Sequence, residues 1–556
     1  MKLNARWDFD DIPANVYQER KRNVGASNHM SFRWKTILWV VGGAVFAVIV
    51  MCIAASVVVS RRARVWAEEW MTHQYNSKVE LSAFRVTIPF PIVQCEGDNL
   101  VLHFKGRQDL PPLIAVRRFT MRTSLRQILG GQRRIEYLRL EGLQINVPPR
   151  EERAGGDVDR NVDQNLGRKF RAVRFDRILS ENATLRILTE KPGKDPLEFD
   201  IQHLRLSSSS DGVLDFVATL SNPKPPGEIV SQGSFGPWNP EAPSLTPVSG
   251  NYNFEKADLS VFSGIAGTLS SKGSYQGVLE KIRVDGTTDT PDFRVTRAGH
   301  PVDLTTTFHA TVDGTDGDTY LEPVEAHFGQ TILLAQGSVE GMKGKKGKNI
   351  TLDLSASRAR IEDLLLLAMK ESPSMTGPVR LKTKFILAPG PEEIPDRLKL
   401  NGSFELGPAH FTRSETQQKI DNMSKRSQGK PQEVVNPQAA TSGDDVATQT
   451  KGNFQLDAGI LSLSTLSFAI PGANVQLGGT YALNGETIDL HGKIRLQAKL
   501  SQTTTGFKSF LLKFADPLFS KQGTGAVLPI KITGPVQHPH YGLELGHKGA
   551  ASSENR

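Results

Sequence analysis

The sequence contains only two cysteines among its 556 residues. Cys52 lies inside an uncharged apolar run and Cys95 lies beyond it, so we expect no intramolecular disulfide. Aromatic residues are also scarce, at 7% of the chain. The region after the apolar run must therefore fold by core burial alone, and the cysteines leave its redox compartment open.

Catalytic and cofactor-binding motifs are missing as well. No HExxH, CxxC, DxDxDG or GxSxG pattern occurs. His538 and His540 flank a proline and could share one face of an extended segment, but no third metal ligand is near them in sequence. The basic stretch from Gly341 to Thr351 lacks the glycine spacing and the Ser or Thr of a phosphate-binding loop. We therefore predict no catalytic residue, no metal site and no cofactor, and we expect that the protein is not an enzyme.

A single-signed charge patch is absent too. The formal net charge is +8, but Lys and Arg are spread along the chain beside Asp and Glu. A nucleic-acid surface would need these cations clustered on one face or stripe. We therefore expect no nucleic-acid partner and assign the charges to solvated strand faces.

One segment is long and apolar enough to cross a membrane. Thr36 to Ser60 carries no charge and is flanked by Arg33 and Lys35 on one side and by Arg61, Arg62 and Arg64 on the other. At about 1.5 Å per residue it covers roughly 37 Å, against roughly 30 Å of hydrocarbon. A cleaved signal peptide has a shorter apolar segment, so we predict an uncleaved transmembrane helix. The flanking charges favour an inside N-terminus only weakly and leave the orientation open.

Beyond Lys78 the sequence has the period of two that is typical of strands. Apolar and polar residues alternate most clearly over 302–312, 379–387, 398–406 and 488–498. One apolar face and one polar face indicate antiparallel sheets that cover something with one side only. A filled sandwich, a closed barrel and a long curved sheet with an apolar trough all satisfy this pattern.

Few segments have a helical pattern. Arg64 to Tyr75 predicts an amphipathic helix at the membrane interface or an ordinary first helix of the domain. Arg360 to Lys370 has acids in its first turn and a lysine in its last, while Asp258 to Leu269 and Thr505 to Phe519 are weaker candidates. We expect these last three helices to cap the sheet. From Thr412 to Thr450 periodicity disappears, which predicts an exposed loop.

Two parts of the sequence are distinctive when taken together. The first is the anchor followed by Val79 to Asn146, with the segment PPLIAVRRFTMRTSLRQILGGQRRIEYLRLEGLQINV. The second is LSFAIPGANVQLGGTYALNGETIDLHGKIRL, followed by GTGAVLPIKITGPVQHPHYGLEL. These parts resemble the AsmA-like family of bacterial envelope proteins. The resemblance implies an inner-membrane anchor, a periplasmic bulk and a curved sheet with an apolar concave face, similar to that of bridge-like lipid-transfer proteins.

The predicted fold class is mainly β with one N-terminal transmembrane helix and a long curved antiparallel β-sheet, groove-like, with a few capping helices. About 25 to 30 strands at roughly 4.8 Å spacing would stack to at most about 120 Å, which leaves open whether the protein spans an envelope. The expected divisions are a cytoplasmic tail (1–35), the transmembrane helix (36–60), an N-terminal AsmA-like β region (61–250), a middle β region (251–411), a flexible loop (412–450), a C-terminal AsmA-like β region (451–546) and a tail (547–556).

The leading hypothesis is an inner-membrane, single-pass, periplasmic protein that shields or transfers phospholipid in envelope and outer-membrane biogenesis. The alternative is a non-enzymatic scaffold or assembly factor for outer-membrane proteins, acting through its sheet edge or the 412–450 loop. The expected partners are phospholipid, the inner membrane and envelope proteins. The candidate lipid-lining residues belong to the apolar rows, although each could also fill an ordinary core: Val302, Leu304, Phe308, Leu398, Leu400, Phe404, Ile488, Leu490, Ile494 and Leu496.

Overall fold

The computed structural model describes residues 50–51, 64–65, 67–69, 71–72, 78–103, 109–130, 134–147, 174–188, 196–210, 212–239, 242–342, 347–435, 446–483, 486–503, 525–535 and 538–543. No helix among them combines the length and the hydropathy of a membrane span. The predicted membrane helix from Thr36 to Ser60 lies outside them, except for the helical residues Val50 and Met51. The predicted tails and the candidate helix from Thr505 to Phe519 lie outside them too.

The described chain is mainly β, and 25 of its strands form one long curved sheet. Its first strands are β1 (Val79–Thr87), β2 (Ile92–Leu102), β3 (Ile114–Ser124), β5 (Tyr137–Val147), β7 (Ile178–Ile187), β8 (Leu197–Ser210), β9 (Val213–Pro223) and β10 (Pro226–Phe235). The middle strands are β11 (Pro247–Asp258), β12 (Ile265–Ala266), β13 (Thr268–Val278), β14 (Lys281–Val295), β15 (Val302–Val312), β16 (Thr319–Phe328), β17 (Thr331–Gly341) and β18 (Lys348–Arg360). The last are β19 (Met375–Thr376), β20 (Pro378–Leu387), β21 (Leu398–Phe411), β22 (Thr448–Asp457), β23 (Ile460–Ile470), β24 (Ala473–Ala482), β25 (Thr487–Leu496), β26 (Ala526–Pro535) and β27 (His540–Leu543).

Strands that follow one another in the chain pair side by side, so the sheet is a long meander. The short strands β12 and β19 pair with β14 and β21, outside this main order. A separate two-stranded parallel sheet joins β4 (Arg134–Ile135) to β6 (Arg174–Phe175). The prediction of a wholly antiparallel sheet is wrong at one place, because β5 and β7 are parallel. Residue alternation shows which face a side chain occupies but carries no information about the direction of the neighbouring strand.

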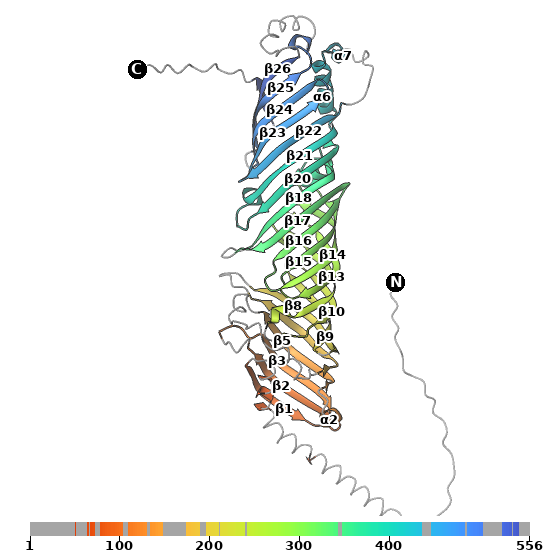
Figure 1. Cartoon of the computed structure of the whole chain (residues 1–556), viewed down its shortest axis with the longest axis vertical. Coiled ribbons are helices and arrows are strands. Elements are labelled where there is room, and N and C mark those ends of the chain that lie inside the picture. The colour runs from red at the N-terminus through yellow and green to blue at the C-terminus, as the bar shows by residue number, and fades with distance from the viewer. Residues whose placement is uncertain are drawn as a thin grey trace, which may run out of the picture.

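The strands stack along the long axis of the molecule, from β1 at the lower end to β26 at the upper end (Figure 1). With about 23 main strands at roughly 4.8 Å, the stack is about 100 Å long. The expected β regions are not separate units, since β11 runs across the boundary after residue 250 and β21 pairs with β22 across the 412–450 segment.

The helices of the described residues are short and lie beside the sheet. The helix predicted over Arg360 to Lys370 is confirmed, and the described residues between Arg64 and Thr72 are helical as predicted. The helix predicted over Asp258 to Leu269 is wrong, because Gly264 and Gly267 have φ values of 90° and 142° that end any right-handed helix. The elements are α2 (Leu125–Leu129), α4 (Ile361–Ala368), α5 (Ile394–Arg397), α6 (Ser414–Ser427) and α7 (Gln432–Val435), with 3-10 turns η3 (Pro243–Leu245), η4 (Leu259–Val261) and η6 (Leu500–Thr503).

The largest correction concerns the loop predicted from Thr412 to Thr450, since α6 and α7 lie within it. Polar contacts hold α6 against the sheet. Ser424 Oγ donates to Pro471 O at 2.8 Å, and Gln417 Nε2 donates to Val446 O at 2.9 Å. The docking side chains are hydroxyls and an amide, so the sequence has no apolar stripe that would predict this helix.

Buried apolar side chains are concentrated in three clusters among the described residues. The first, with Leu81 and Phe119, and the second, with Val86 and Cys95, lie in the first strands of the sheet. The third, with Val379, lies where α4 packs against β18 and β21. The remaining sheet therefore folds without a thick buried core.

Candidate functional site

One row of side chains crosses the sheet from β1 to β26 without a charged member. The register of each strand pair places one residue of each strand from β1 to β26 in this row, apart from the short strands β4, β6, β12 and β19, and directly paired residues share a face of the sheet. We name it the apolar row and its side the apolar face: Val86, Cys95, Met121, Leu138, Ile178, Leu206, Phe216, Gly233, Gly250, Tyr275, Val284, Ala310, Leu321, Gly337, Leu352, Phe385, Leu400, Leu456, Leu461, Tyr481, Ile488 and Gly534.

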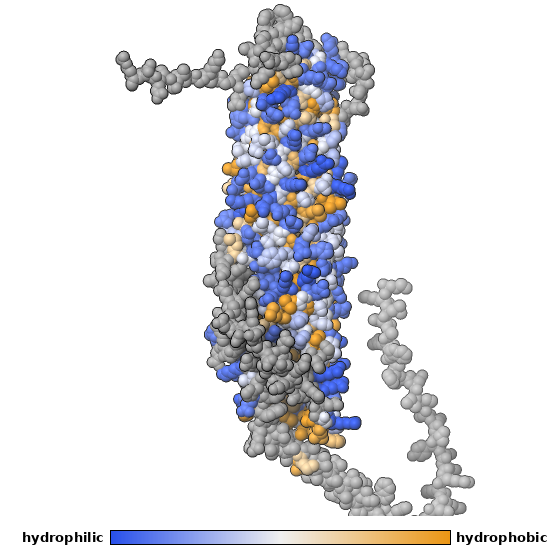
Figure 2. Space-filling model, viewed as in Figure 1, coloured by the Kyte–Doolittle hydropathy of each residue, from blue (hydrophilic) through white to orange (hydrophobic). Residues whose placement is uncertain are grey.

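The opposite side of the sheet, the polar face, carries the charges. Lys399 and Asp457 form an ion pair at 3.0 Å, and Lys384 lies 3.7 Å from Asp353. Hydrophilic residues dominate the side of the molecule seen in Figure 2. The two faces therefore differ in chemistry over the whole length of the sheet.

All ten candidate lipid-lining residues lie on the apolar face and are half-buried. In the apolar row from β8 to β25, the members are also half-buried, apart from Ala310 and Leu456, which are buried. A second sheet packed on this face would bury such side chains fully, as in a sandwich. Among the described strands, only the two-stranded sheet of β4 and β6 is separate from the main one. No second layer of described strands therefore covers the apolar face.

The ten candidate residues lie on one face of the sheet, in three separate groups on β15, β21 and β25. Leu400 and Ile488 belong to the apolar row, and Leu490 lies beside it on β25. The structure does not bring the groups on β15, β21 and β25 into contact, because whole strands separate them. Sequence reasoning missed the connecting members, such as Leu352 and Leu461, because register shifts interrupt the alternation of their strands.

Aromatic rings lie over glycines of the neighbouring strands on the apolar face. A Cβ atom on Gly286 would lie 2.9 Å from Phe308 Cζ, and one on Gly452 would lie 3.0 Å from Phe404 Cε1. Both rings belong to candidate residues. Each ring occupies the space that a side chain would fill if the glycine opposite it were a larger residue. The glycines thus let the rings lie against the sheet.

Four hydroxyl groups on the apolar face, those of Ser231, Tyr275, Tyr252 and Ser271, are hydrogen-bonded in two pairs. Ser231 Oγ donates to Asn251 O at 3.0 Å and lies 2.7 Å from the Tyr275 hydroxyl. The Tyr252 hydroxyl lies 3.0 Å from Ser271 Oγ. Burial raises the pKa of both tyrosines, against a smaller lowering by the serine hydrogen bonds. These groups therefore add no charge to the apolar face.

The first strands differ from the rest because their apolar face is packed. Leu81, Val116, Phe119 and Leu143 are buried in one cluster, with Leu81 at 2% exposure. A ligand on the apolar face would therefore occupy the half-buried part from β8 onward.

A hollow of about 380 Å³ lies between α6 and β25. Met423 of the helix and the candidate residues Ile494 and Leu496 supply its apolar lining, while Lys419 and Arg426 add two cations. Lys419 and Arg426 are exposed, and neither forms an ion pair with a described residue. The hollow is therefore lined by the apolar face on one side and by two positively charged side chains of α6 on the other.

A second hollow, of about 660 Å³, lies over β17 to β22. Polar-face side chains such as Asp353, Lys382 and Lys384 line it. This lining suits water better than an acyl chain, so the larger hollow does not belong to the candidate site.

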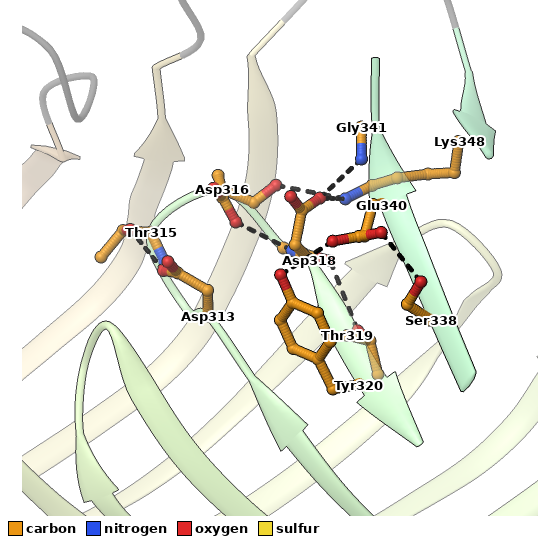
Figure 3. A network of polar contacts seen from close by, with 11 residues as sticks. Asp313, Thr315, Asp316, Asp318, Thr319, Tyr320, Ser338, Glu340, Gly341 and Lys348 are labelled. Carbon is orange, nitrogen blue, oxygen red and sulfur yellow. Dashed lines mark hydrogen bonds and ion pairs between the residues drawn. The ribbon is translucent and has the colours of Figure 1, made fainter. Parts of the chain in front are cut away.

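Acidic side chains gather at the turn between β15 and β16 (Figure 3). Gly341 N donates to Asp318 Oδ1 at 2.7 Å, and Lys348 Nζ pairs with the same carboxylate. Burial raises the pKa of Asp316, against a lowering by the hydrogen bond from Asp318 N. The network ties this turn to β17 and β18. In the described part of the chain, no group of His, Cys, Asp and Glu side chains has the arrangement of a metal site.

Comparisons with protein-family models, with characterised proteins and with solved structures gave no match. The resemblance to the AsmA-like family stays a prediction from the sequence. A function must therefore be argued from the apolar face itself.

Proposed function

We propose that the protein shields phospholipid acyl chains on its apolar face and thereby moves or partitions phospholipid in a bacterial envelope. The apolar row from Val86 to Gly534 carries this proposal, because it crosses the sheet without a charge. In line with the AsmA-like resemblance, the proposed location is periplasmic, with Thr36 to Ser60 as a single inner-membrane anchor. Envelope proteins are proposed as further partners.

The energetic requirement for such a surface is large. Each acyl CH₂ exposed to water costs about 0.8 kcal/mol, or over about 20 kcal/mol for two long chains. Apolar side chains in a folded protein are normally removed from water by packing against one another. Those of the apolar row from β8 to β25 are mostly half-buried, and no second sheet of described strands covers them.

The hollow beneath α6 fits one end of such a ligand. Ile494 and Leu496 offer an apolar wall, and Lys419 and Arg426 offer charge-assisted hydrogen bonds to a phosphate. A phospholipid combines these two chemistries in one molecule.

Photo-crosslinking in cells tests the proposal on the full chain. A benzophenone amino acid replaces Leu400 or Ile488 on the apolar face, and Ser403 or Asp489 on the polar face as matched controls. Phospholipid adducts identified by mass spectrometry at the apolar positions alone support the groove. Protein adducts at these positions, without lipid, support the scaffold, and an absence of lipid adducts from folded protein refutes the proposal.

A further inference from the structure

The end of the sheet at β1 and β2 carries exposed apolar side chains. Leu129 is 80% exposed and Phe90 is 74% exposed, more than any other large apolar residue in the described part of the chain. Ile128 and Ile92 are 48% and 42% exposed. Hydrophobic residues gather at this lower end in Figure 2. We name the segments Ile88–Ile92 and Leu125–Leu129 the tip.

The backbone holds the two segments of the tip together. Leu125 N donates to Pro91 O at 2.9 Å, and Ile92 pairs with Ser124 where β2 meets β3. Although α2 is largely apolar, none of its residues is buried. Leu125 packs against the core cluster of Val86, Val93 and Cys95, whereas the exposed side chains of Ile128 and Leu129 do not serve the core.

The two segments of the tip carry only positive charge, although Glu96 lies opposite Arg85 where β1 pairs with β2. Neither segment of the tip contains Asp or Glu. Arg126 in α2 and Arg85 on β1 are exposed, and neither forms an ion pair with a described residue. Apolar side chains flanked by unpaired arginines match the interface of a bilayer that contains anionic lipid.

The chain that leads back to Thr36–Ser60 reaches the sheet at this same end. Glu68 Oε1 accepts a hydrogen bond from Leu81 N at 3.1 Å, and Arg64 Nη1 donates to Ser82 O at 3.2 Å. These contacts cover the free edge of β1. The residues that follow the predicted membrane helix in the chain therefore contact β1, the strand that leads into the tip, and this connection argues for a bilayer as the occupant.

We propose that the tip inserts its apolar side chains into the interfacial layer of a phospholipid bilayer, with Arg85 and Arg126 attracted to the headgroups of anionic lipids. The contact would set one end of the sheet against the membrane surface. It requires no lipid on the apolar face, so it is independent of the proposed transfer function.

Fluorescence quenching on the full chain in phosphatidylglycerol-containing proteoliposomes tests this contact. Phe90→Cys and Leu129→Cys are labelled with an environment-sensitive dye, and Leu334→Cys and Ile460→Cys serve as controls that are 41% and 47% exposed on the polar face. The unsubstituted protein gives the background from native cysteines. We expect spin-labelled lipids to at least halve the emission at both tip positions and to leave the controls unchanged. Tip emission no more quenched than that of the controls overturns the proposal.

A second quenching experiment tests whether the arginines contribute to membrane contact. Replacing Arg85 and Arg126 by glutamine should reduce tip quenching in phosphatidylglycerol vesicles and leave it unchanged in pure phosphatidylcholine. An equal loss in both vesicles, or none in either, overturns the assignment of the arginines to anionic headgroups. Because the readout is the depth of the tip, a negative result leaves the photo-crosslinking test of the groove unaffected.

Discussion

Replacing Leu400 by glutamate places a charge in the middle of the apolar row. Leu400 pairs with Phe385 on one side and with Leu456 on the other, so the carboxylate has no partner in its row. A bound acyl chain must leave room for the water that hydrates the carboxylate. If about four methylenes lose their cover at about 0.8 kcal/mol each, binding weakens by about 3 kcal/mol, or about a hundredfold.

The assay titrates purified full-length protein with a fluorescent phospholipid. Ser403→Glu is the matched control, because Ser403 is exposed on the polar face of the same strand and pairs with Lys382. Circular dichroism and protease resistance establish that both variants are folded. Lowering the pH until the new carboxylate is neutral should restore lipid binding to Leu400→Glu, whereas Leu400→Lys should show no such recovery.

Equal lipid affinity for Leu400→Glu and Ser403→Glu would refute the reasoning. It would mean that the apolar row does not contact the ligand. A loss in both variants would point instead to a general effect of charge on the sheet.

Three further predictions concern the surroundings of the apolar face. Lys419→Glu combined with Arg426→Glu should lower the affinity for anionic phospholipid by about tenfold, whereas Lys425→Glu on another side of α6 should not. Ser424→Ala removes the hydrogen bond from the buried Ser424 to Pro471 O, which should cost about 0.5 to 1.5 kcal/mol and speed hydrogen exchange in α6; unchanged exchange would contradict the docking contact. The raised pKa of Asp316 means that its contribution to stability is present below the unfolded pKa and is lost as the pH rises through the folded pKa. Asp316→Asn should therefore raise the melting temperature at about pH 7 but not at about pH 3, and an equal effect at both would argue against the shift.

The sequence predicted the faces of the strands well where alternation is uninterrupted. Over β25, residues from Ile488 to Leu496 alternate strictly, and their half-burial matches that pattern. The same reasoning could not follow the apolar row across β16 to β18, where shifts in register leave extra residues in one strand of a pair. The separate apolar segments could be joined into one row only from the register of each strand with its neighbour, which the structure gives.

Two features had no signal in the pattern of apolar residues. Buried Ser424 and Ser427 dock α6, so its sequence has the composition of a loop. The tip was missed for the opposite reason, since Leu125 to Leu129 looks like a segment destined for the core. Leu125 does pack against the core, and only the exposure of Ile128 and Leu129 shows that the end of the segment points away from it.

The meander has a consequence for how such a sheet can change in size. Apart from the packed cluster of the first strands, the main contacts between strands are made with immediate neighbours, as in repeat proteins, so each later strand depends chiefly on the two beside it. A hairpin inserted between two strands restores the original strand direction and extends the apolar row by two residues. Each insertion would lengthen the sheet by about 10 Å without altering the rest. The length of the sheet can therefore change in steps of one hairpin.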